Sequence, residues 1–206
     1  MKKGMTITYE VEDGLYINVT NRCSNRCTFC IRNNGDGAYG SDSLWLEHEP
    51  CTEEILCSVF ARDLSKYSEI VFCGYGEPTL RFDTAKEVAA KIKEKFPNVK
   101  IRINTNGHSD LICGRNTAPE YADLFDTVSI SLNAPTAEKY NEICHPVYKE
   151  RAFAAVIEFA NNVNKYVQKT IFSVVSDFID ENEIAQCKKI AEAAGVPLKV
   201  RAYEGK

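Results

Sequence analysis

The stretch Cys23-Ser24-Asn25-Arg26-Cys27-Thr28-Phe29-Cys30 carries three cysteines at the spacing C-x3-C-x2-C. It directly follows an apolar run at residues 15–19 that is typical of a buried strand. Three thiolates on one short loop can bind three irons of a [4Fe–4S] cluster, which leaves the fourth iron without a protein ligand. An open metal position usually binds a substrate or a cofactor, as it does in catalytic zinc sites.

Three other interpretations compete with a cluster. A structural zinc site usually needs four ligands, and the chain has no second C-x2-C pair. A disulfide framework fits an even number of cysteines in a secreted protein, whereas this chain has nine and no sign of secretion. The cysteines could also be ordinary core residues. The cluster is favoured because the loop follows a predicted strand, at the end where α/β proteins bind ligands. The other cysteines are isolated: Cys51, Cys57, Cys73, Cys113, Cys144 and Cys187.

The composition is that of an ordinary globular protein. The 206 residues predict a single domain over 1–206, and 44% hydrophobic and 26% charged residues are enough for a sizeable core. The net charge of −4 does not favour non-specific binding of nucleic acids, so DNA is not an expected partner. A net charge does not exclude a local basic patch.

No stretch reaches the ~18–20 apolar residues that a membrane-spanning helix requires. The first ten residues have two lysines but no apolar core of a signal peptide. Many unpaired cysteines indicate a reducing compartment, so we expect a cytoplasmic protein without a membrane association.

Strand and helix patterns alternate six times along the chain. This alternation favours right-handed crossovers and parallel strands, and six units are too few for a closed eight-stranded barrel. We therefore expect an α/β fold, an open partial (βα)6 barrel with a parallel sheet and outer helices. A weak lead-in strand is expected at 5–10. The main strands are expected at 15–20, 70–73, 99–103, 127–132, 170–175 and 197–203, and the helices at 51–67, 81–96, 118–125, 135–143, 149–164 and 180–194.

Residues 31–50 are rich in glycine and asparagine, which favours a loop over a helix. The loop is long for a connection, and long ordered loops are often functional. We expect a lid or insert beside the cysteine loop, with Trp45 as an apolar anchor. The alternative is a mobile insert.

Polar motifs follow the next three predicted strands. The carboxyl ends of parallel strands share one edge, so these motifs should meet the cysteine loop there. Glycines allow close approach of the backbone to a ligand, and Glu, Asn and Ser suit amine, ribose and carboxylate groups. S-adenosylmethionine has all three groups, and its amine and carboxylate can chelate the free iron. The motifs are Gly74-Tyr75-Gly76-Glu77, Asn104-Thr105-Asn106-Gly107 and Ser131-Leu132-Asn133.

Three further residues are candidates for catalysis. Cys73 precedes the glycine motif, His108 follows Asn106-Gly107, and Arg201 lies on the last predicted strand, where it could meet a carboxylate. His108 could support the site or meet the substrate. Cys73 and Arg201 also have plain interpretations, a small buried strand residue and a surface arginine.

The sequence resembles the radical S-adenosylmethionine superfamily through the cysteine motif at 23–30 and the glycine–glutamate motif at 74–77. More narrowly it resembles the TatD-associated radical SAM subgroup. The residues behind the narrower likeness are Thr20-Asn21-Arg22-Cys23, Cys27-Thr28-Phe29-Cys30-Ile31-Arg32, Gly35-Asp36-Gly37 and Leu44-Trp45-Leu46.

The resemblance assigns roles by position. It implies that Cys23, Cys27 and Cys30 ligate the cluster, that Phe29 lies near the adenine, and that Gly74, Gly76 and Glu77 hold the methionine amine. It also implies that Ser131 and Asn133 face ribose or carboxylate, with Asn104 and Asn106 nearby. Tyr75 stands where many members have glycine, so its side chain must point away from the ligand.

The resemblance also implies the chemistry. A low-potential donor of flavodoxin or ferredoxin type reduces the cluster, S-adenosylmethionine is cleaved to methionine and a 5′-deoxyadenosyl radical, and the radical removes hydrogen from a small or macromolecular substrate. Within this class a glycyl-radical activase is the main alternative. Two alternatives lie outside this class. One is an iron–sulfur electron carrier or sensor, but such a protein normally has four cluster ligands and this loop offers three. The other is a subunit that assists a TatD-like hydrolase.

Overall fold

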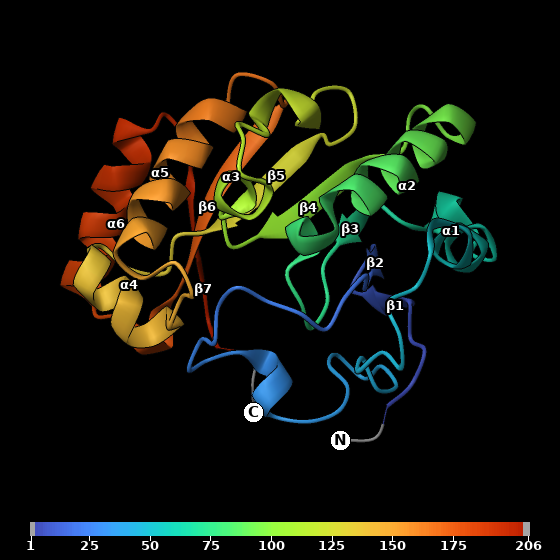
Figure 1. Cartoon of the computed structure of the whole chain (residues 1–206), viewed down its shortest axis with the longest axis horizontal. Helices are drawn as coiled ribbons and strands as arrows, with labels where there is room; N and C mark the ends of the chain where they lie inside the picture. Colours follow the sequence, from blue (N-terminus) through green and yellow to red (C-terminus); the bar gives the residue numbers. More distant parts are fainter. Residues whose placement is uncertain (1–2, 204–206) are drawn as a thin grey trace.

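The computed structural model describes residues 3–203, and in it a single curved sheet carries helices on its convex side (Figure 1). The strands are β1 (Thr8–Val11), β2 (Gly14–Ile17), β3 (Glu69–Phe72), β4 (Ile101–Thr105), β5 (Thr127–Ser131), β6 (Lys169–Val175) and β7 (Leu198–Arg201). The helices are α1 (Thr52–Phe60), α2 (Phe82–Lys95), α3 (Ser109–Cys113), α4 (Ala137–Cys144), α5 (Ala152–Val163) and α6 (Glu181–Ala193). Short 3-10 turns are η1 (Ile31–Asn33), η2 (Leu64–Lys66), η3 (Pro78–Arg81), η4 (Ala118–Tyr121), η5 (Lys149–Arg151) and η6 (Ser176–Phe178).

The seven strands lie in sequence order from β1 to β7. β1 pairs antiparallel with β2, and every later neighbour pairs in parallel. Among the described residues β7 does not pair with β1, so the barrel stays open. The predicted open α/β barrel with a lead-in strand and outer helices is confirmed.

Alternation along the strands separates an apolar side from a polar side. In β4, Ile101 and Ile103 are fully buried in the core beneath the helices, whereas Arg102 and Asn104 point to the other side. The concave face of the sheet therefore carries polar groups at the edge where the strands end.

The structure differs from the sequence prediction between β4 and β5. The helix predicted at 118–125 is only the 3-10 turn η4, because Asp123 adopts a left-handed conformation with φ of 61°. Helix α3, of five residues, was not predicted, since it is too short for an apolar period to show. The helix predicted to reach residue 67 ends at Phe60, and the Asp63 carboxylate accepts from the Ser65 amide to start η2.

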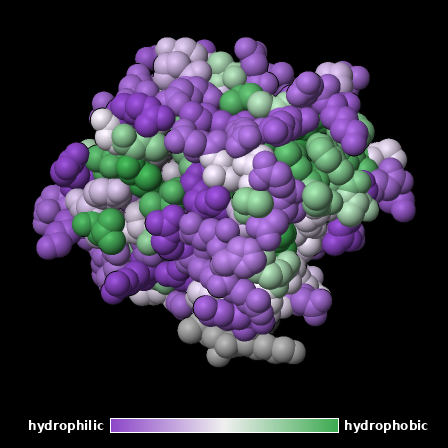
Figure 2. Space-filling view, turned by 45° about the vertical axis from the view of Figure 1, so that its right-hand side comes forward, coloured by the Kyte–Doolittle hydropathy of each residue, from purple (hydrophilic) through white to green (hydrophobic). Residues whose placement is uncertain are grey.

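The loop at 31–50 packs on the β1–β2 side of the sheet. Tyr9, Ala38, Leu44 and Tyr75 form a small buried apolar cluster there, and Trp45 stacks edge-on against Tyr75 at 5.1 Å between ring centroids. Trp45 thus has the anchoring role that the sequence suggested. On the face of the molecule shown in Figure 2, hydrophilic residues cover most of the surface, and apolar residues gather in separate areas.

Candidate functional site

The cysteine loop lies at the carboxyl end of β2, and backbone bonds to a distant segment hold it there. The amides of Arg26 and Thr28 donate to the carbonyls of Cys144 and Ile143 at 3.0 and 2.9 Å, at the end of α4. The Val147 amide donates to the Ser24 carbonyl at 2.9 Å. The loop is therefore a fixed element of the fold and its shape does not depend on its own sequence alone.

The three thiols are partly exposed and unpaired. Cys23 accepts two N–H···S contacts, from the Asn25 amide at 3.4 Å and from Asn106 Nδ2 at 3.8 Å. Burial raises the pKa of Cys23 to about 12 and also raises the pKa of Cys30. In the metal-free protein these groups are thiols, and any metal that they bind must displace their protons.

The loop fits an iron–sulfur cluster better than a single ion. Among residues 3–203 no three His, Cys, Asp or Glu side chains converge tightly enough to hold one metal ion. A cluster does not require such convergence, because each thiolate binds a different iron of the cube. Three thiols on one loop, with N–H donors aimed at a sulfur, match that donor set.

Cys144 lies beside Cys27. A hydrogen bond from the Cys27 thiol to Cys144, together with burial, raises the pKa of Cys27, and Asn133 Nδ2 donates to the Cys144 sulfur at 3.5 Å. Cys144 itself is fully buried. Nothing in the sequence pattern pointed to this contact, since the two cysteines are far apart along the chain.

The glycine motif packs directly on the segment that leads into the cysteine loop. A Cβ atom on Gly76 would lie 2.5 Å from the Arg22 carbonyl oxygen and closer still to that of Thr20, and one on Gly74 would overlap the Asn18 side chain. The Glu77 amide donates to the Arg22 carbonyl at 2.7 Å. These glycines are thus required for the contact between two loops.

The Glu77 carboxylate is buried and fully engaged by the protein. Its Oε1 accepts from Thr79 N, Thr79 Oγ1 and Thr105 Oγ1, and its Oε2 accepts from the Asn106 amide, all between 2.7 and 3.1 Å. Burial raises its pKa, and these four donors oppose that effect without cancelling it. Glu77 therefore links the ends of β3 and β4.

Tyr75 points away from this edge, as the likeness requires. Its side chain is only 3% exposed, and its hydroxyl donates to the Gly35 carbonyl at 3.0 Å in the loop 31–50. The packing of the Tyr75 side chain against the loop 31–50 therefore explains why a tyrosine is tolerated where many members have glycine.

The other candidates separate into two groups. Cys73, Asn104, Ser131 and Arg201 lie on the concave side, where the Asn104 amide contacts the Cys73 thiol. Two others lie elsewhere. Asn133 points to Cys144, and the Phe29 ring packs on Phe178 at 5.0 Å, which in turn contacts Tyr203 at 5.2 Å.

His108 is completely buried and supports the cysteine loop. Its Nδ1 lies 3.3 Å from Ser24 Oγ, and its Nε2 lies 3.3 Å from the Tyr140 hydroxyl. Asn25 Nδ2 donates to the same hydroxyl at 3.0 Å, and Asn106 Nδ2 donates to Ser24 Oγ at 2.8 Å. This histidine contacts the loop between the cysteines, and that contact indicates a positioning role.

Burial lowers the pKa of His108 to about 4, so the ring is neutral near pH 7. An unfolded histidine has a pKa near 6.5, so below that pH the unfolded chain binds a proton that the folded chain does not. The free energy of unfolding should therefore fall by about 3 kcal/mol between pH 7 and pH 4 from this group. Urea denaturation of His108→Gln should lack this component, while His145→Asn, at an exposed position, should retain it. Equal pH slopes for wild type and His108→Gln would contradict the assignment.

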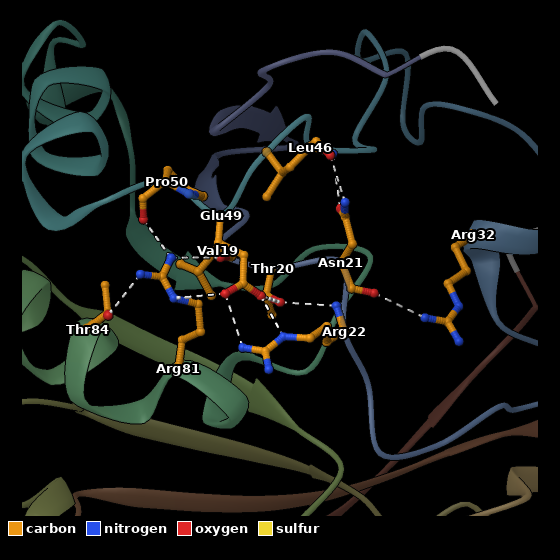
Figure 3. Close-up of polar contacts among 10 residues, drawn as sticks. All are labelled: Val19, Thr20, Asn21, Arg22, Arg32, Leu46, Glu49, Pro50, Arg81 and Thr84. Carbon is orange, nitrogen blue, oxygen red and sulfur yellow. Dashed lines mark hydrogen bonds and ion pairs between the residues drawn. The ribbon is translucent and has the colours of Figure 1, made fainter.

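Glu49 joins the loop 31–50 to the entrance of the cysteine loop (Figure 3). It accepts from Arg22 Nε at 2.7 Å, Arg22 Nη2 at 3.0 Å and Thr20 Oγ1 at 2.5 Å, and it pairs with Arg81 at 3.7 Å. Arg81 also donates to the Val19 and Pro50 carbonyls. No motif in the sequence included Glu49 or Arg81.

A second arginine contacts the loop on its other side. Arg32 donates to the carbonyls of Asn21, Asn25 and Tyr75 at 3.4, 3.4 and 3.5 Å. The Asn21 side chain in turn exchanges two hydrogen bonds with the Leu46 backbone, at 2.8 and 3.0 Å (Figure 3). The charge of Arg32 also opposes in part the rise that burial causes in the pKa of Cys23 and Cys30.

Glu49→Gln should lower the free energy of unfolding at pH 7 by about 0.5–1 kcal/mol, because the Glu49 side chain is 36% exposed and its charge is partly screened. Burial acts to raise the Glu49 pKa, but Arg22, Thr20 and Arg81 outweigh it and the pKa is lowered. This stabilisation is present above the pKa of the unfolded carboxyl and is lost as the pH falls through the folded one. The urea midpoint of Glu49→Gln is compared with that of Glu47→Gln, which changes an exposed neighbouring residue. Identical midpoints for the two variants would refute the prediction.

Comparison with known proteins agrees with this geometry. The family model described as Radical SAM superfamily matches residues 17–189. A probable GTP 3′,8-cyclase of Methanosarcina acetivorans is 30% identical over 63% of this chain and 36% of its own length. Molybdenum cofactor biosynthesis protein 1 of Drosophila melanogaster is 30% identical over 92% of this chain and 31% of its own. The chain thus spans about a third of the length of these two relatives.

Solved structures share the fold at low sequence identity. Streptococcus suis SuiB bound to its precursor peptide SuiA superposes with a TM-score of 0.68 at 17% identity, over 93% of this chain and 39% of that one. The enzyme anSMEcpe with bound AdoMet superposes with a TM-score of 0.61 at 19% identity, over 91% of this chain and 50% of that one. Together with the matched family model, these likenesses show that the chain belongs to the radical SAM superfamily of enzymes, whose cofactors are a [4Fe–4S] cluster and S-adenosylmethionine.

Proposed function

We propose that this protein cleaves S-adenosylmethionine reductively and uses the resulting radical to remove a hydrogen atom from a substrate. The observation that carries the proposal is the position of the three-thiol loop at the carboxyl end of β2, where the segment that leads into the loop is in direct contact with the motif at 74–77. This is the edge at which parallel α/β sheets bind ligands.

The protein's own residues would hold and orient the two cofactors. Cys23, Cys27 and Cys30 would bind the cluster, and the backbone at 74–77 would receive the methionine amine. Glu77 supports that backbone through the contacts it makes within the protein. When bound, the cluster and S-adenosylmethionine supply the 5′-deoxyadenosyl radical. Ser131 and Asn104 lie on the concave face, which supports a role for them in meeting ribose or carboxylate groups.

The remaining expectations are part of the same proposal. We propose one domain over 1–206, a cytoplasmic location, and a low-potential donor of flavodoxin or ferredoxin type. No helix within residues 3–203 is long and apolar enough to span a bilayer. The narrower membership in the TatD-associated subgroup, with a functional link to a TatD-like hydrolase, rests on the sequence likeness alone. Residues 31–50 would form a cover beside the cluster, anchored by Trp45 and Glu49.

The test is direct. The protein is reconstituted anaerobically with iron and sulfide, reduced with dithionite and given S-adenosylmethionine, and 5′-deoxyadenosine is quantified. Product should form with wild type and with Cys57→Ala, which removes an exposed thiol on α1, and should vanish with Cys27→Ala. A bound cluster that yields no product, and whose electron paramagnetic resonance does not change with S-adenosylmethionine, would favour an electron carrier or sensor instead.

A further inference from the structure

Charges are unevenly distributed on the concave face of the sheet. In each strand, the residues between those that pack under the helices face the inside of the open barrel. In the described strands this face carries four cations and only one carboxylate. These residues are Glu69 of β3, Arg102 of β4, Lys169 of β6, and Lys199 and Arg201 of β7.

The single carboxylate is already neutralised. Glu69 pairs with Arg102 at 2.8 Å, and Arg102 also donates to the Tyr16 hydroxyl at 3.1 Å. Lys169 lies at the amino end of β6, away from the cysteine loop. Lys199 and Arg201, on the last strand, therefore remain as the uncompensated positive charges near the edge where the strands end.

No carboxylate of residues 3–203 lies within ion-pair distance of Lys199 or Arg201. The acid on the adjoining segment, Asp177, instead accepts from the Tyr203 amide at 2.8 Å and from Ser176 Oγ at 3.4 Å. The Nε of Arg201 is a buried donor without a hydrogen-bond partner. Buried polar atoms normally have partners, so this donor indicates a place for an external acceptor group.

The charge of Arg201 acts on Cys73, whose pKa is raised by burial and lowered in part by Asn104, Arg201 and Arg102. Cys73 directly follows β3, which is four strands away from β7 in the sheet. Arg201 lies on the concave face of β7, and its Nε is buried.

The neighbouring strands add donors to this position. Ser129 and Ser131 of β5 and Ser173 of β6 face the same side, and hydroxyls donate readily to oxyanions. A guanidinium and an ammonium beside hydroxyl groups are the donor set that binds carboxylates and phosphates. The chain as a whole has a net charge of −4, so this positive region is local.

We propose that Lys199 and Arg201 bind an anionic group, a carboxylate or a phosphate, of the substrate. This inference rests on the proposed function and adds the chemical class of the substrate to it. S-adenosylmethionine also carries a carboxylate, and the experiment below distinguishes the two sources of the anion.

The experiment uses inorganic phosphate as the probe on the reconstituted holoenzyme. Equilibrium dialysis with radiolabelled phosphate gives its Kd with and without saturating S-adenosylmethionine, for wild type and for the double variant Lys199→Gln/Arg201→Gln. The matched control is Lys188→Gln/Lys189→Gln, which removes two charges from exposed positions of α6. Iron content and the Kd of S-adenosylmethionine are measured on each protein, so a failure to load the cofactors is seen separately.

Phosphate should bind wild type and the control equally, with and without S-adenosylmethionine. The Kd should rise at least about tenfold in the Lys199/Arg201 variant, which corresponds to about 1.4 kcal/mol. Equal phosphate binding in all three proteins, or none in wild type, would overturn the proposal. Competition between phosphate and S-adenosylmethionine, with a weaker cofactor Kd in the double variant, would also overturn it and assign the two cations to the cofactor carboxylate.

Discussion

Glu77→Gln should lower the free energy of unfolding of the metal-free protein by about 2–4 kcal/mol, although it changes only one atom. The carboxylate accepts four hydrogen bonds, and an amide of the same shape must turn its NH2 group toward at least one of those donors. The site is buried, so water does not relieve the mismatch. Urea denaturation followed by circular dichroism measures the change.

Glu94→Gln is the matched control, because Glu94 lies on the exposed side of α2. It should unfold within about 0.5 kcal/mol of wild type. If Glu77→Gln unfolds at the same urea concentration as Glu94→Gln, the carboxylate does not link β3 and β4 in the way described.

Gly76→Ala should have an effect of similar size, about 2–4 kcal/mol, and should reduce the iron retained after reconstitution. The added methyl group meets two carbonyl oxygens, those of Thr20 and Arg22, and neither belongs to a flexible side chain. Relief requires the motif to move away from the segment entering the cysteine loop, which breaks the bond from the Glu77 amide to Arg22. Thermal unfolding and iron analysis check both parts.

Gly35→Ala provides the control for this substitution. A Cβ atom there has its nearest neighbour at 3.8 Å, so the change should be close to neutral. Normal stability and iron content in Gly76→Ala would mean that the contact between the two loops is not required for the site.

The sequence was informative wherever one segment determined its own structure. The strand–helix alternation predicted the open sheet, and the cysteine spacing with the motif at 74–77 led to the correct superfamily. The likeness also required Tyr75 to point away from the ligand, and its side chain lies under the loop 31–50.

The contacts that support the site could not be predicted from local patterns. Glu49 and Cys144 each act on the cysteine loop or the segment that enters it through tertiary packing, and neither belongs to a motif. His108 was a candidate for catalysis, but its buried contacts with Ser24 and Tyr140 became visible only in the folded chain. The likeness assigns Glu77 to the methionine amine, and the hydrogen bonds that its carboxylate accepts within the protein became visible only in the folded chain.

The long-range support of the cysteine loop sets an order of events during translation. The loop leaves the ribosome early, yet the contact between Asn25 and Tyr140 spans 115 residues, and the backbone bonds to Ile143 and Cys144 span a similar distance. At about 5–20 residues per second, those partners are synthesised roughly 6–23 s later. During that interval the three thiols belong to an unfinished chain. The native contacts of the cysteine loop therefore form only after α4 has been made and has folded.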